Sequence, residues 1–192
     1  MQAQTRPLRQ SLCLLLLRTR LLFHDDDYAN IQISAENLTK EILSRSDEET
    51  REFARQFATT LQRGDIVALI GELGAGKTQF IRGIADVFNV ETEVTSPTFA
   101  LLNIYGGHVH GKPVKLYHFD WYRLQDEEEL YHIGYEDYLY GEGLCMIEWA
   151  DRFPSKVPKH ARRITIEHAG ETERRIVIEG GLPIARADTF WR

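Results

Sequence analysis

Cysteine is scarce in this chain. The 192 residues contain two cysteines, Cys13 and Cys145, which lie far apart and match no metal-ligand spacing. They indicate free thiols in a reducing environment rather than a metal site. The scarcity therefore favours a cytoplasmic protein.

The sequence also lacks long hydrophobic runs and an excess of basic residues. No run approaches the roughly 20 apolar residues that a membrane-spanning helix needs, so no membrane association is expected. Lysine and arginine number 23 against 29 acidic residues, which gives a net charge of −6. A net negative charge argues against a domain whose main role is binding nucleic acid, although it permits a local basic patch or an RNA-binding partner. The length suits one globular domain, with a tail at most.

The first 23 residues differ in composition from the rest. They contain four arginines and no acidic residue, around a short apolar run that ends at Arg18. The run is too short for a secretory signal; an organellar transit peptide fits the composition, but a disordered extension or a misassigned start is favoured. We predict a disordered extension over residues 1–37 and a folded domain over residues 38–192.

A phosphate-binding loop is the strongest motif in the sequence. A short apolar run, Ile66–Ile70, is followed by GELGAGKT at residues 71–78, which fits G-x-x-x-x-G-K-[ST], and then by an amphipathic helical pattern. Glycines let backbone N–H groups point at phosphate oxygens, and the helix N-terminus adds a favourable dipole. Lys77 would bridge the β- and γ-phosphates and the Thr78 hydroxyl would bind Mg²⁺. The motif predicts a nucleoside triphosphate site.

The remaining pattern predicts an α/β fold, with a P-loop NTPase-like mixed β-sheet flanked by helices. Ser46 and Glu49 form a capping box for a helix that Gly64 would end. Strand-like runs at 99–105 and 114–119 flank GGHVHGKP, which we expect to be a long hairpin loop. The last predicted elements are a buried strand at 144–147 and a hairpin formed by 164–168 and 175–179.

Two acidic residues end predicted strands. Asp120 follows KLYHF at the place expected for a Walker-B aspartate, and Glu148 ends the CMI strand. Ligands in such sheets bind at the carboxyl ends of the parallel strands, so both are candidates for holding Mg²⁺ or orienting water. Each could instead be a solvated strand end. Trp149 could stack on a base or sense binding. The hydroxyls of Thr95, Ser96 and Thr98 could contact the γ-phosphate or the attacking water, or these residues could form a plain turn.

Four motifs together resemble one family. GELGAGKT, SPTF, HFDWYRL and IEW occur in an order and spacing similar to the TsaE (YjeE) family of P-loop ATPases, over about residues 38–178. The resemblance implies an ATPase that uses Mg²⁺ and is required for threonylcarbamoyladenosine modification of tRNA. It also implies action with the TsaD and TsaB partner proteins, which carry the transfer to tRNA, so that tRNA is met only through the complex. Departures are small: Glu72 and Trp121 replace an aspartate and an aliphatic residue.

The resemblance also implies roles for individual residues. Lys77, Asp120 and Glu148 would be catalytic, with Asp120 positioning or activating water. Thr78 and Glu148 would bind the metal, and Ser96 and Thr98 would belong to a switch segment. The ATP-binding set would be Asp47, Gly74, Ala75, Gly76, Lys77, Thr78, Gln79 and Trp149.

Two other functions fit a P-loop on a mixed sheet. A small-molecule kinase would need an arginine-rich lid, and no such segment follows the central strands. A nucleotide-gated adaptor would use ATP to switch partner binding without essential hydrolysis. A GTPase is disfavoured, because the chain contains no Asn-Lys-x-Asp sequence.

Overall fold

A computed structural model of the chain describes residues 33–34, 39–109 and 111–180. Nearly all of the predicted N-terminal extension, and Cys13, lie outside these residues. No helix among them is long and apolar enough to cross a membrane.

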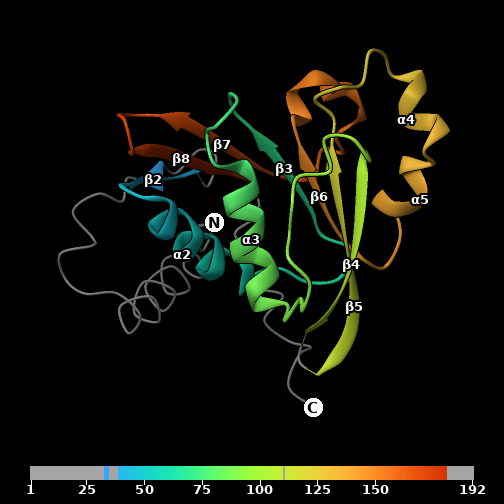
Figure 1. Cartoon of the computed structure of the whole chain (residues 1–192), viewed down its shortest axis with the longest axis horizontal. Coiled ribbons are helices and arrows are strands. Elements are labelled where there is room, and N and C mark those ends of the chain that lie inside the picture. Colours follow the sequence, from blue (N-terminus) through green and yellow to red (C-terminus); the bar gives the residue numbers. More distant parts are fainter. Residues whose placement is uncertain (1–32, 35–38, 110, 181–192) are drawn as a thin grey trace, which may run out of the picture. The chain divides into compact units, whose positions relative to one another are not determined.

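The described residues form one mixed β-sheet with helices on both faces (Figure 1). The strand order is β1-β2-β8-β7-β3-β6-β5-β4. The pairs β7–β3, β3–β6 and β6–β5 are parallel, and the outer pairs are antiparallel. This arrangement confirms the predicted α/β fold. The strands are β1 (Ile33–Ser34), β2 (Thr39–Ser44), β3 (Ile66–Ile70), β4 (Leu102–Val109), β5 (Lys112–Asp120), β6 (Leu144–Glu148), β7 (Arg162–His168) and β8 (Arg174–Glu179), and the helices are α2 (Asp47–Ala58), α3 (Lys77–Val87), α4 (Glu128–His132) and α5 (Tyr135–Leu139).

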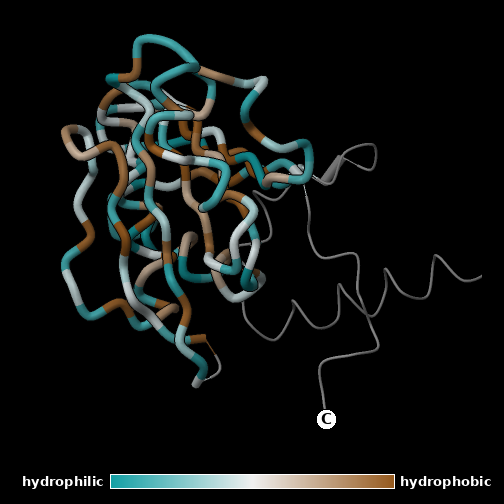
Figure 2. Tube along the Cα trace, turned by 90° about the vertical axis from the view of Figure 1, so that its right-hand side faces the viewer, coloured by the Kyte–Doolittle hydropathy of each residue, from teal (hydrophilic) through white to brown (hydrophobic). Residues whose placement is uncertain are grey.

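Each face of the sheet has its own hydrophobic core. One core joins the sheet to α2 and α3 and includes the fully buried Phe80, Ile84 and Met146. The other joins it to α4 and α5 and includes Trp121 and Ile147. Every residue of β6 is buried, whereas burial alternates along β4. Figure 2 shows how hydrophobic and hydrophilic residues are distributed along the trace of the chain. The predicted central strand is therefore confirmed at β6.

Helix α2 begins at the predicted capping box. The Ser46 hydroxyl accepts a hydrogen bond from the Glu49 N–H, and the Glu49 carboxylate accepts one from the Arg45 N–H. The helix ends at Ala58, earlier than the predicted stop at Gly64, which instead adopts a left-handed conformation (φ 81°) in the turn before β3.

An aspartate joins α2 to α3. Asp86 accepts two hydrogen bonds of 2.7 Å from the Arg51 guanidinium and one of 2.9 Å from Arg55. The pKa of Asp86 is lowered, and the hydrogen bonds from Arg51 are the largest cause. The hydrogen bond from Arg55 lowers it further. This ion pair fixes the helix that follows the P-loop against its neighbour.

The predicted long loop between the fourth and fifth strands is wrong. β4 and β5 instead pair as far as His108 with Pro113 and Val109 with Lys112. A side chain on Gly107 would lie 2.5 Å from the Phe88 carbonyl oxygen, which also accepts a 2.6 Å hydrogen bond from the His108 N–H. The glycine therefore serves close approach of a strand to the end of α3, not a loop. The predicted start is also wrong, because β4 begins at Leu102 and Phe99 is exposed.

The sheet brings three predicted strand ends together. β6 lies between β3 and β5 and runs parallel to both. Glu148 is in register with Leu69 on one side and with Asp120 on the other. The P-loop after β3, Asp120 and Glu148 therefore meet at one edge of the sheet.

Candidate nucleotide-binding site

The P-loop has a backbone that glycine makes possible. Gly74 and Gly76 have φ angles of 77° and 106°, and Gly76 is the residue before the first turn of α3. A side chain on Gly71 would lie 2.3 Å from the carbonyl oxygen of Ile166 in β7. Left-handed backbone and close packing against a strand both favour glycine here. The loop thus holds the N-terminus of α3 toward the site.

Lys77 is buried at the base of this loop. Lys77 is 4% exposed, and its Nζ donates 2.8 Å hydrogen bonds to the carbonyl oxygens of Gly71 and Glu72. Nζ also lies 3.8 Å from the centre of the Trp149 ring. Burial lowers the pKa of Lys77, and the charge of Glu148 is the largest opposing effect. The two carbonyl oxygens hold the ammonium group in place, and no carboxylate of the described residues forms a salt bridge with it.

Glu148 links the P-loop helix to the sheet. Its Oε1 accepts a 2.8 Å hydrogen bond from the Thr78 hydroxyl and lies 2.9 Å from His118 Nε2. Glu148 is 3% exposed. A hydroxyl and one carboxylate are a sparse donor set, and no group of three or more His, Cys, Asp or Glu side chains in the described residues could hold a metal alone. This set fits Mg²⁺, which binds through one or two protein oxygens together with phosphates and waters.

Asp120 is held by the loop that precedes β4. Its Oδ2 accepts hydrogen bonds from the hydroxyls of Ser96 (2.6 Å) and Thr98 (2.8 Å), and Oδ1 accepts one from the Tyr122 N–H (2.9 Å). The predicted hydroxyl-rich segment is thus in direct contact with the predicted carboxylate.

A cavity of about 380 Å³ collects most of the predicted residues. Gln79 and Asp47 meet at its edge, with 3.3 Å between Nε2 and Oδ2. Of the predicted site residues, Ala75 alone does not line it, because its side chain is fully buried. The lining residues are Asp47, Leu73, Gly74, Gly76, Lys77, Thr78, Gln79, Ser96, Thr98, Asp120, Tyr122, Glu148 and Trp149.

Two aromatic side chains lie beside each other at this cavity. The rings of Tyr122 and Trp149 are 4.8 Å apart between centres. Trp149 has a φ of 59°, a conformation that bulky residues rarely adopt and that is concentrated at functional sites. In this conformation the indole ring lies against Lys77 Nζ. Tyr122 was not assigned to the nucleotide site from the sequence, although its place two residues after Asp120 was a usable signal.

The β7–β8 hairpin supports the P-loop from behind. Arg174 Nε donates a 3.2 Å hydrogen bond to the Ala75 carbonyl oxygen, and Nη2 donates a 3.4 Å one to that of Gly74. Carbonyls that point outward leave the N–H groups of the loop to point inward. Sequence reasoning missed Arg174, because its contacts are about a hundred residues away.

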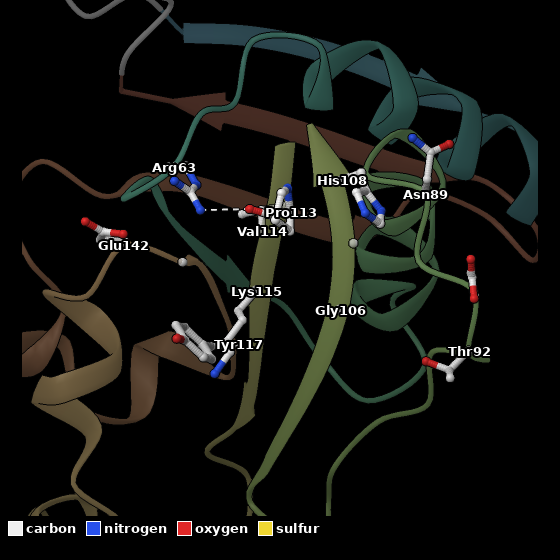
Figure 3. A pocket seen from close by; sticks show the side chains of 13 residues that line it. Arg63, Asn89, Thr92, Gly106, His108, Pro113, Val114, Lys115, Tyr117 and Glu142 are labelled. Atoms are coloured by element: carbon white, nitrogen blue, oxygen red, sulfur yellow. Dashed lines mark hydrogen bonds between the residues drawn. The ribbon is translucent and has the colours of Figure 1, made fainter. Parts of the chain in front are cut away.

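A larger cavity of about 800 Å³ lies at the opposite end of the sheet (Figure 3). Arg63, Lys115 and Glu142 line it, and Arg63 donates a 2.7 Å hydrogen bond to the Pro113 carbonyl oxygen. It shares no residue with the P-loop cavity. The larger cavity is therefore not the place where the phosphate-binding chemistry gathers.

Comparison with known proteins identifies the family. The model of the family described as "Threonylcarbamoyl adenosine biosynthesis protein TsaE" matches residues 44–176. Proteins named tRNA threonylcarbamoyladenosine biosynthesis protein TsaE are similar: one from Treponema pallidum is 38% identical over 71% of this chain and 97% of its own, and one from Bacillus subtilis is 39% identical over 67% and 78%. A crystal structure of Bacillus subtilis YdiB covers 77% of this chain and 88% of its own, at 31% identity and a TM-score of 0.64. The chain belongs to the TsaE family.

Proposed function

We propose that this chain binds ATP and Mg²⁺, hydrolyses ATP, and thereby serves the formation of threonylcarbamoyladenosine in tRNA. The observation that carries the proposal is the meeting of Lys77, the Thr78–Glu148 pair and Asp120 in one cavity at the ends of three adjacent strands. The names of the relatives supply the tRNA modification.

The P-loop would hold the phosphates. The N–H groups around Gly74–Gly76 and the N-terminus of α3 provide the donors, and Lys77 would exchange its two carbonyl partners for β- and γ-phosphate oxygens. Glu148 and the Thr78 hydroxyl would hold Mg²⁺ directly or through its waters. When bound, the cation neutralises charge on the phosphate oxygens.

Asp120 would orient the attacking water. Its carboxylate is buried at the end of β5, in register with Glu148, and both its oxygens already accept hydrogen bonds. A water that replaces the Ser96 or Thr98 hydroxyl would meet a fixed acceptor, which supports general-base or water-positioning chemistry. The same hydroxyls would then be free to contact the γ-phosphate, as a switch segment does.

Trp149 and Asp47 would border the nucleoside. Both line the cavity, and the indole offers a flat apolar face beside the phosphate-binding lysine. Gln79, which hydrogen-bonds Asp47, would help to shape that edge.

We further propose cytoplasmic action with the TsaD and TsaB proteins, with residues 38–192 as the ATPase domain and 1–37 as an extension. A net charge of −6 suits a subunit that meets tRNA through a complex rather than alone. Tight, salt-dependent binding of tRNA by the isolated protein would contradict this part of the proposal.

The test is phosphate release from ATP, measured for the protein alone and then with TsaB, TsaD and tRNA, with Lys77→Ala as the control. We expect hydrolysis that rises with the partners and disappears in the control. Transfer of phosphate to a small acceptor would indicate a kinase. Nucleotide binding without hydrolysis under any condition would indicate a nucleotide-gated adaptor.

A further inference from the structure

His118 is a buried polar side chain that lies on β5 between buried apolar residues and the site acid Asp120. It lies on β5 and is fully buried, on the sheet face that α3 covers. The residues two and four positions earlier on the same face, Leu116 and Val114, are buried and apolar. An apolar side chain would therefore fit the packing, and the imidazole needs a different explanation.

The imidazole makes one hydrogen bond, to Glu148. Nε2 lies 2.9 Å from Glu148 Oε1, and Nδ1 has no hydrogen-bond partner among the residues that the structure describes. A carboxylate only accepts hydrogen bonds, so the ring is a donor at Nε2. The ring packs against Tyr105, with 6.3 Å between ring centres, which limits its freedom to turn away.

Glu148 is therefore held from two sides. The Thr78 hydroxyl reaches Oε1 from α3, and the His118 ring reaches the same oxygen from β5. In the described part of the chain both side-chain hydrogen bonds to this carboxylate end on Oε1, which leaves Oε2 for a cation or its water. Two donors on regular elements hold Oε1 in place before any ligand arrives.

We propose that His118 is a positioning residue that holds Glu148 for Mg²⁺. This inference rests on the proposed function, because it assigns a role toward the metal that would accompany ATP. Mutation of a residue that hydrogen-bonds a metal ligand typically lowers the metal affinity about 10- to 100-fold. A residue that serves packing alone would change stability without changing how ATP binding depends on Mg²⁺.

The test compares three variants of the full chain. His118→Leu removes the donor and puts an apolar side chain of similar size in its place. His118→Gln restores an N–H donor. Leu116→Val is the matched control, since it shortens a buried residue on the same face of β5 without touching Glu148. Calorimetry gives the Kd for ATP in EDTA and in excess Mg²⁺, and thermal unfolding gives the Tm.

In His118→Leu we expect the gain in ATP affinity on addition of Mg²⁺ to be about tenfold smaller than in the unaltered chain. The Kd for ATP in EDTA should be unchanged. His118→Gln should recover most of this loss, and Leu116→Val should change the Tm alone. The inference is overturned if His118→Leu shows the unaltered Mg²⁺ effect, or if Leu116→Val loses as much. Failure of the unaltered protein to bind ATP at all would overturn the proposed function and this inference together.

Discussion

The two acidic residues of the site are neighbours in register but are held in different ways. Glu148 receives hydrogen bonds from α3 and β5, which are regular elements packed in one core. Asp120 receives two of its three from an irregular segment that contains Ser96 and Thr98. Regular elements hold a geometry more rigidly than loops do.

The difference suggests a division of labour. A metal ligand needs a constant position, and the surroundings of Glu148 supply it. A residue that receives water during a reaction needs partners that can leave, and the loop hydroxyls around Asp120 suit that role. Four changes would break or sharpen this comparison.

Removal of the anchored carboxylate should have the largest effect. Glu148→Ala takes away the carboxylate that we propose as a metal ligand and leaves Thr78 and His118 without their acceptor, so phosphate release should fall about 1,000-fold. The Mg²⁺-dependent gain in ATP affinity, measured by calorimetry, should fall with it. Glu142→Ala, an acid beside the opposite cavity, is the control and should behave as the unaltered protein.

Neutralisation of the other carboxylate should affect turnover and spare binding. Asp120→Asn keeps the size of the side chain but weakens it as an acceptor for a water proton, so phosphate release should fall about 100-fold. The Kd for ATP in Mg²⁺ should stay within about threefold of the unaltered value, because the role that we propose for Asp120 lies in hydrolysis and not in ATP binding. A large rise in Kd would show that the two carboxylates share one role.

Removal of the loop hydroxyls should loosen one region and leave the other unchanged. Ser96→Ala combined with Thr98→Val deletes two hydrogen bonds to a charged group, so amide hydrogen exchange in residues 95–101 should accelerate about tenfold. Exchange in β6 should not change, because Glu148 keeps its partners. Equal acceleration in both regions would argue that Asp120 and Glu148 are held as one unit.

A change away from the site should show the smallest effect, on stability alone. Asp86→Asn weakens the link between α2 and α3 and should lower the free energy of unfolding by about 1 kcal/mol at pH 7. Because the Arg51 guanidinium lowers the pKa of Asp86 in the folded chain, this contribution is fully present above the ordinary aspartate value of about 3.9. This contribution to the free energy of unfolding is lost as the pH falls from about 3.9 through the lower pKa that Asp86 has in the folded chain.

Denaturant unfolding at pH 7 and pH 3 measures the difference. The difference in the free energy of unfolding between Asp86→Asn and the unaltered chain should be smaller at pH 3 than at pH 7. A difference that stays constant would assign the effect to packing rather than charge. Arg63→Gln, which removes a charge that does not pair with Asp86, is a suitable control.

Prediction from sequence succeeded where the chemistry is local. The P-loop places its glycines, Lys77 and Thr78 within eight residues, and the two acidic residues each end a predicted strand, so their meeting follows from the parallel sheet. The fold class followed from the same pattern. Their roles in binding and hydrolysis remain predictions.

Prediction failed where distant residues decide the outcome. The glycines of β4 have the composition of a loop, and the close approach of Phe88, after the end of α3, explains Gly107 in a strand. The support of the P-loop by Arg174 joins residues about a hundred positions apart. The His118–Glu148 hydrogen bond spans two strands whose pairing the sequence does not state.

The two carbonyl partners of Lys77 have a consequence for the heat of nucleotide binding. The ammonium group already donates to Gly71 and Glu72, so contact with phosphate exchanges hydrogen bonds and does not simply add them. The net enthalpy that this residue would contribute to nucleotide binding is then smaller than that of an ammonium group with no partners to give up. Ground-state affinity would come mainly from the backbone amides of the loop, while the lysine would act most strongly on the charge that develops during hydrolysis.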